Sequence, residues 1–135
     1  MKNTKFKVYD YDSKTMYNQE DLIITFDSIG EDVYVYKDGK VEPLYRYELL
    51  PCIRLKDEDV EEVYEGAIVE VTIIDKFDEI EKSVGVVMYD EDDFSWLIRE
   101  LDDSYWYLNE YPSSEGKRIL KIIGNVYENP ELLEE

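Results

Sequence analysis

Hydrophobic and polar residues alternate along most of this chain, and a period of two residues predicts β-strands rather than helices. In the first third of the chain the pattern predicts strands at residues 5–9, 16–17, 22–26 and 33–36. The Asp38-Gly39 pair follows the last of these strands and favours a tight hairpin turn. This part of the chain is therefore expected to form β-hairpins.

The middle of the chain predicts a break between two halves. Residues 45–50 fit either a strand or a short helix. Pro51 is expected to end this element, because proline has no backbone N–H to donate, and residues 52–55 then resume as a strand. An acidic run at residues 57–62 follows. We place the boundary there, between a first half of residues 1–56 and a second half of residues 57–135.

Five strands are predicted in the second half, at residues 68–74, 84–89, 94–98, 105–108 and 119–123. The acidic residues 90–93 form the turn after the second of them. Asn129 is expected to cap one helical turn at residues 131–133, with Pro130 at its first position. Short antiparallel strands favour a small barrel, because closing a sheet removes its exposed edges. The expected fold is mainly β with little helix: an SH3-like roll in residues 57–135, with the N-terminal hairpins packed on it.

The charge of the chain lies almost entirely in its second half. Residues 1–56 hold 10 acids and 9 bases, whereas residues 57–135 hold 24 acids and 6 bases, out of a net charge of −19. Nucleic acids and anionic membranes bind Lys and Arg and repel such a surface. We therefore expect no direct binding to nucleic acid or to a membrane.

The sequence points to a protein of the cytoplasm. Its start lacks the apolar stretch that a signal peptide needs. The single cysteine, Cys52, excludes an internal disulfide and suits a reducing compartment.

Few residues form a pattern typical of catalysis. There is no His in the sequence, so Cys52 lacks the usual base that would activate a thiol nucleophile. The acids at residues 90–93 carry the charge of a calcium loop without the glycine that folds such a loop back. A hydrolase that uses two carboxylates stays an alternative, because 34 acids always offer pairs. The expectation is a protein without catalytic residues, metal or cofactor.

Acidic and aromatic residues combine in one candidate partner surface. Alternation places Trp106 on one face of its strand and Tyr105 and Tyr107 on the other, so both tyrosines are exposed if Trp106 points inward. The candidate partner-binding residues are Asp90, Glu91, Asp92, Asp93, Asp102, Asp103, Tyr105 and Tyr107. They suit a protein partner with a basic surface, such as a host nucleic-acid-binding protein, and fast, salt-sensitive association.

Other roles for the charge stay open. The acidic half is a candidate DNA mimic that inhibits a host DNA-binding or defence protein. A duplex about 30 Å long carries about 18 charges, so mimicry requires the charge to lie largely on one face. The charge is equally consistent with a purely solubilising role. An exposed edge strand in the first half, such as residues 33–36, would allow a homo-oligomer.

Five stretches of the sequence, taken in order, point to a family. They are K-F-K-V-Y-D at residues 5–10, Met16-Tyr17, V-Y-E-G-A-I-V at 63–69, G-V-V-M-Y-D at 85–90 and I-G-N-V-Y-E-N-P-E-L-L at 123–133. Together they resemble the YopX family of phage and prophage proteins, and the last stretch is the most specific. The resemblance implies a mainly β domain with an SH3-like roll and a phage accessory role. It implies no activity, because the family's biochemical function is not established.

Overall fold

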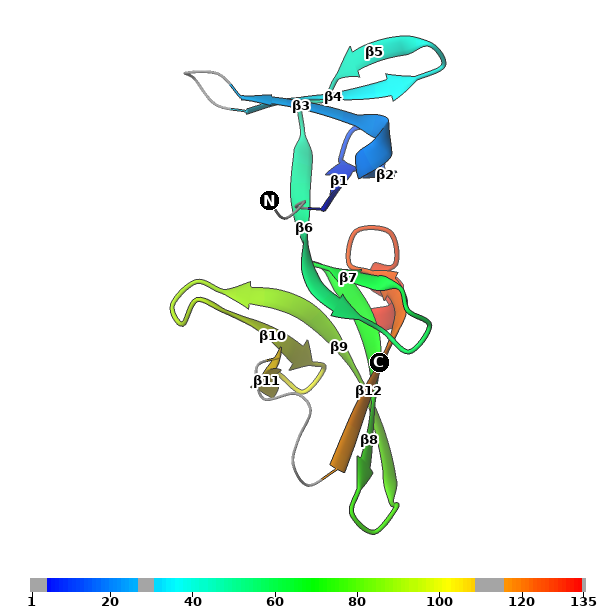
Figure 1. The fold of residues 1–135 in the computed structure, drawn as a ribbon, viewed down its shortest axis with the longest axis vertical. Coiled ribbons are helices and arrows are strands. Elements are labelled where there is room, and N and C mark those ends of the chain that lie inside the picture. The colour runs from blue at the N-terminus through cyan, green and yellow to red at the C-terminus, as the bar shows by residue number, and fades with distance from the viewer. Residues whose placement is uncertain (1–4, 27–30, 109–115, 135) are drawn as a thin grey trace. The chain divides into compact units, whose positions relative to one another are not determined.

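The computed structural model describes residues 5–26, 31–108 and 116–134, and Figure 1 shows the path of the chain. Two compact units divide it, an N-terminal unit of Met1–Pro51 and a C-terminal unit of Cys52–Glu135. In the described residues the helices are two short 3-10 turns, so the predicted mainly β class is confirmed. No helix in this part of the chain is long and apolar enough to cross a membrane.

The N-terminal unit consists of hairpins. Its elements are β1 (Phe6–Asp10), β2 (Thr15–Asn18), η1 (Gln19–Asp21), β3 (Leu22–Phe26), β4 (Glu31–Lys37), β5 (Lys40–Pro43) and the first part of β6 (Tyr47–Lys56). The predicted hairpin turn is confirmed, since Asp38 and Gly39 both have positive φ angles, of 53° and 77°. Residues 33–36 do not form an edge. They lie in β4, which pairs with β3 on one side and β5 on the other, so the prediction that they form an exposed edge is wrong.

Strand β6 runs through Pro51 without a break, which corrects the predicted interruption. Before Pro51 the strand pairs with β1, and Phe6 faces Pro51 at the end of that ladder. From Cys52 onward it pairs with β7 (Glu62–Tyr64). A proline is tolerated in a strand where no ladder hydrogen bond needs its N–H, and the change of partner offers such a place.

The C-terminal unit is organised around one five-stranded antiparallel sheet. Its strands are β8 (Ala67–Asp75), β9 (Ile80–Asp90), β10 (Ser95–Glu100), β11 (Tyr105–Tyr107) and β12 (Gly116–Asn125), and η3 (Pro130–Leu133) follows them. All five predicted strands are present. Their order is β11-β10-β9-β8-β12, which leaves β11 and β12 at opposite edges. The sheet is therefore open in the described residues, and the predicted closed roll is not observed.

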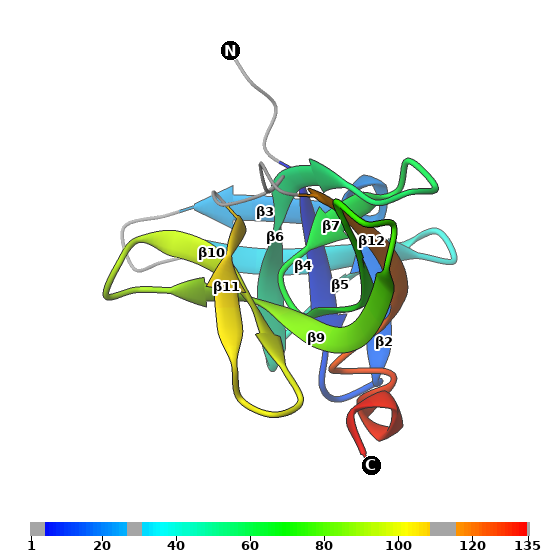
Figure 2. The same cartoon turned by 90° about the horizontal axis from the view of Figure 1, so that it is seen from below.

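The two faces of this sheet differ. The inner face holds a buried cluster of Val63, Ala67, Val69, Val71, Val87, Ile98 and Leu120, with Trp96 and Trp106 packed against it. Figure 2 shows β9 as a strongly curved strand, which pairs with β8 along its first part and with β10 along its second. Gly85 belongs to both ladders, opposite Val69 and Glu100. The opposite face, here called the outer face, is the side on which the register aligns Met88, Leu97 and Tyr107.

The acidic run at residues 57–62 lies inside the C-terminal unit, at the turn between β6 and β7. Asp57 is only 7% exposed, and its carboxylate accepts a hydrogen bond from the N–H of Ile122 in β12. The run therefore helps to hold the C-terminal unit together.

Candidate functional site

Two adjoining hollows form a groove on the outer face of the five-stranded sheet. One hollow has a volume of about 440 Å³ and the other about 490 Å³. They share Met88, Tyr89 and Arg99, so the groove is continuous along the β9–β10 hairpin. Volumes of this size are typical of pockets that bind ligands or anchor side chains.

One end of the groove is the acidic turn, defined as residues 90–93, which joins β9 to β10. Asp90, Glu91 and Asp92 line the hollow at this end. The Asp90 carboxylate accepts the N–H of Asp92 at 2.9 Å, a local contact that shapes the turn. This run is thus the hairpin turn that the sequence predicts.

Tyr107 connects the acidic turn to β11. Its hydroxyl oxygen lies 2.7 Å from a carboxylate oxygen of Asp93 and 3.0 Å from one of Asp90. The hydrogen bond to Asp93, and then that to Asp90, raise the pKa of Tyr107 well above its ordinary value. The hydrogen bond from Tyr107 in turn lowers the pKa of Asp90. At neutral pH the phenol therefore stays a donor and the carboxylate stays charged.

The other end of the groove has a second acidic turn, between β10 and β11. Asp103 lines the groove there, whereas the Asp102 carboxylate accepts the N–H of Ser104 at 2.9 Å. Hydrogen bonds from Ser104 lower the pKa of Asp102, so this carboxylate is also charged at neutral pH. Strand β10 separates the two turns. The structure thus divides the predicted acidic residues between the two ends of one hairpin.

The two predicted tyrosines lie on the outer face. Trp106 packs against the buried cluster on the inner face, as alternation predicts, and Tyr105 is 56% exposed. The rings of Tyr105 and Tyr107 meet edge to face with centroids 5.6 Å apart. Tyr105 lines the hollow beside the acidic turn. The predicted pairing of aromatic and acidic residues is therefore present at that end.

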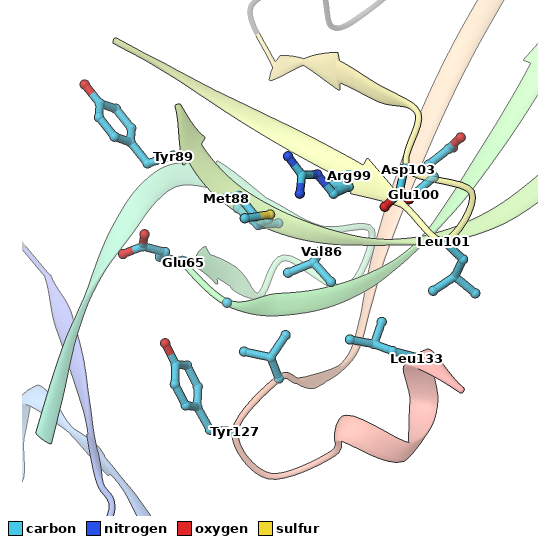
Figure 3. Close-up of a pocket in the computed structure, with 13 residues that line it drawn as sticks. Glu65, Val86, Met88, Tyr89, Arg99, Glu100, Leu101, Asp103, Tyr127 and Leu133 are labelled. Carbon is cyan, nitrogen blue, oxygen red and sulfur yellow. The ribbon is translucent and has the colours of Figure 1, made fainter. Parts of the chain in front are cut away.

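Sequence reasoning missed the residues at the centre of the groove. Figure 3 shows Val86, Met88 and Arg99 on the strands, facing Tyr127 and Leu133 from the C-terminal segment. Arg99 makes no ion pair or side-chain hydrogen bond within the described residues. Among the described residues that line the groove, Arg99 is the one with a cationic side chain, and carboxylates border the groove at both ends.

The C-terminal segment, residues 124–133, forms a clasp that folds back on the sheet. The side chain of Asn125 accepts the N–H groups of Tyr127 and Glu128 at 3.0 and 2.8 Å, and the Asn129 side chain accepts the N–H of Asn125 at 3.1 Å. Asn129 occupies the predicted position before η3, with Pro130 first in the turn, but its side chain does not cap that turn. The family-specific stretch of the sequence thus builds one wall of the groove.

Two glycines let the clasp close. Gly66 has a φ of +86°, and a methyl group there would lie 2.9 Å from the Tyr127 ring. At Gly124, a methyl group would lie 2.6 Å from the Asn129 amide oxygen and 2.9 Å from Leu132. A side chain at either position would push the clasp off the sheet.

The Gly124→Ala variant is expected to loosen the clasp and lower stability by about 1–2 kcal/mol, because both crowding atoms belong to side chains that yield in part. Hydrogen exchange measures the loosening of the clasp. The N–H of Val126, which donates to the backbone oxygen of Gly66 at 2.9 Å, should lose protection. As a control, Leu132→Ala should cost less in the Gly124→Ala background than alone. Equal costs in both backgrounds would contradict the crowding.

The comparisons with known proteins agree with this fold. A family model described as "YopX protein" matches residues 5–134. A structure titled "Crystal structure of protein EF1440 from Enterococcus faecalis" is similar with a TM-score of 0.54 and 23% identity, covering 99% of this chain and 100% of that one. At this identity the likeness shows a shared fold alone. No match to a curated protein is found.

Proposed function

This chain belongs to the YopX family, and we propose that it is a phage or prophage accessory protein that acts in the cytoplasm by binding another protein. The observation that carries the proposal is the groove, an apolar floor between two acidic turns with tyrosines beside it. An apolar centre with a polar rim is the usual anatomy of a protein-binding surface. Because this rim is acidic, a basic partner surface complements it.

The arrangement of the acids supports a binding role over a hydrolase. Figure 3 draws one of the two hollows, with Glu65 towards one side of it and Glu100 and Asp103 towards the other. Both carboxylate oxygens of Glu100 accept hydrogen bonds from serine hydroxyls, at 2.6 and 2.9 Å. A pair of carboxylates that cleaves a glycosidic bond must instead face a common point, roughly 5–9.5 Å apart. The proposed role is therefore non-enzymatic.

Imitation of DNA is the second candidate, and the charged turns at both ends of the groove favour it. The two candidate functions differ in whether the apolar floor of the groove contacts the partner. A DNA mimic presents regularly spaced charge, whereas a partner that uses the groove also buries an apolar side chain. Duplex DNA should compete for the partner of a mimic. Duplex DNA should not displace a partner that is held mainly by the apolar floor.

The test is capture of host proteins by the tagged full chain, after nuclease treatment and at low and high salt. A variant with Asp90, Asp92, Asp93, Asp102 and Asp103 changed to Asn should retain at least tenfold less of a partner captured at low salt. Asparagine keeps the acceptor that shapes each turn, so the hairpin should stay folded. Partners captured equally by both proteins would contradict the proposal.

A matched control separates local charge from total charge. Changing Glu58, Asp59, Asp78, Glu79 and Glu81 to their amides removes the same number of charges at exposed positions that do not line the groove. This control should retain the partner. Equal loss from both variants would mean that only the net charge matters.

A further inference from the structure

We propose that the groove binds an extended segment of the partner that carries two basic residues four positions apart, with one apolar residue midway between them. This inference rests on the proposed function and deepens it, because it states the pattern of the segment that binds. The pattern follows from the spacing of the two acidic turns and from what lies between them.

The spacing comes from the length of β10. Ser95, at its start, pairs with Asp90 of the acidic turn, and Glu100 ends it beside the second turn. Five residue steps at about 3.4 Å separate these positions by roughly 17 Å. An extended segment lying along the hairpin has the same rise per residue. Side chains an even number of positions apart lie on the same face of an extended segment. Two basic side chains four positions apart, roughly 14 Å, therefore both face the groove, and their length covers the rest of the distance to the two turns.

The charges at the two ends have the same sign. Asp90, Glu91 and Asp92 line one end, and Glu100 and Asp103 line the other. The Asp90 carboxylate is held by the hydrogen bonds that it accepts, and the hydrogen bond from the N–H of Ser104 to Asp102 shapes the turn that carries Asp103. Each end thus offers a fixed negative charge to a Lys or Arg side chain.

The centre of the groove selects against a third basic residue. Its floor is Val86 and Met88, and Leu101 and Leu133 border it. Arg99 lines both hollows, and its guanidinium is not neutralised by an ion pair within the described residues. A cation at the centre would meet both apolar surface and a like charge, whereas a leucine or phenylalanine side chain would bury apolar area.

Defined peptides test this pattern directly. The reference peptide is Lys-Ser-Leu-Ser-Lys with blocked ends, and three others replace its Leu by Gly, replace its Leu by Lys, or place both lysines together at one end. Titration by NMR at low salt should show the reference peptide binding about tenfold tighter than the Gly peptide. The Lys peptide should bind no tighter than the reference, despite its extra charge. The peptide with adjacent lysines should also bind more weakly.

Two groove variants assign the apolar contact. Met88→Gln and Leu101→Gln should each abolish the preference for Leu over Gly, and Leu101 is exposed enough for its variant to fold normally. Phe77→Gln is the matched control, because Phe77 is 75% exposed and lines neither hollow. It should keep the preference.

The outcomes distinguish the two proposals. Affinities that follow only the number of lysines would overturn the inference. The proposed function would then survive if the Asn variant of the acidic turns still lost its partner. Peptides and partner that bind the Asn variant as well as the native protein would overturn both.

Discussion

Replacing Asp57 by Asn is expected to lower the free energy of unfolding of the C-terminal unit by about 3 kcal/mol. One carboxylate oxygen accepts the N–H groups of Asp59 and Glu61 at 3.0 and 2.9 Å, and the other accepts the N–H of Ile122 at 2.9 Å. An amide keeps only one of these oxygens. Its NH2 group would face the N–H of Ile122, so the variant loses a charge-assisted hydrogen bond and brings two buried donors together.

This loss should depend on pH. Burial of Asp57 opposes ionisation, but the N–H groups of Ile122, Glu61 and Asp59 favour the carboxylate more strongly, and the pKa of Asp57 lies below its usual range. A pKa lower in the folded than in the unfolded state gives stability that is fully present above the unfolded pKa of about 3.9. That stability disappears as the pH falls through the folded pKa. The difference between native protein and variant should therefore be full at neutral pH and shrink in acid.

Urea unfolding followed by tryptophan fluorescence at pH 7 and pH 3 measures this difference, since Trp96 and Trp106 both pack on the core of this unit. Asp75 supplies a matched control. It shapes the β8–β9 turn in the same way, with one oxygen accepting the N–H groups of Phe77 and Glu79 at 2.8 and 3.0 Å. Asp75→Asn retains that oxygen and should cost less than about 1 kcal/mol. Equal costs for the two variants would refute the role given to Ile122.

The positions of the strands could be predicted from the sequence because alternation is a local property. All five strands of the C-terminal unit, the Asp38-Gly39 hairpin and the turn at residues 90–93 follow from residues close to each other in the chain. The closed roll could not be predicted reliably, because closure depends on which strands pair. Here β12 returns to pair with β8, and the three-residue strand β11 lies at the opposite edge of the sheet.

Pairing over long distances also explains the error at residue 51, and it explains why the sequence gives no sign of the role of Asp57. Pro51 continues a strand because β6 exchanges β1 for β7 there, which its neighbours in sequence do not indicate. Asp57 has the appearance of a solvated acid in an acidic run. Its decisive contact is with Ile122, which lies 65 residues further along the chain.

The candidate site was predicted in part for the same reason. The outer-face position of both tyrosines and the turn beside them follow from alternation within one hairpin, although only Tyr105 is exposed and Tyr107 is half-buried, contrary to the prediction that both are exposed. The groove itself requires the clasp, which β12 carries back to the sheet, and so Arg99, Met88 and Leu133 were missed. One feature of the sequence pointed to the groove. The stretch I-G-N-V-Y-E-N-P-E-L-L is the most specific part of the family resemblance, and the structure shows that it forms one wall of the groove.

Gly85→Ala is the second substitution with a large expected effect, a loss of about 3 kcal/mol. A methyl group at this position would lie 2.5 Å from the Cγ2 atom of Ile98 and 2.9 Å from the backbone oxygen of Arg99. Neither atom can move away easily, since Ile98 is fully buried and Arg99 belongs to the paired strand. Relief requires β9 and β10 to separate, and both carry the floor of the groove.

A double-mutant cycle tests whether Ile98 causes this cost. Ile98→Leu conserves volume but removes the γ2 methyl group, so Gly85→Ala should cost at least about 1 kcal/mol less in that background. Urea unfolding of the four proteins gives the coupling energy. The contact with the Arg99 oxygen remains in the leucine background, and part of the cost should therefore persist. If the costs of the two substitutions are additive, the contact between residue 85 and Ile98 does not cause the loss of stability. The loss would then come from the bend of β9 itself.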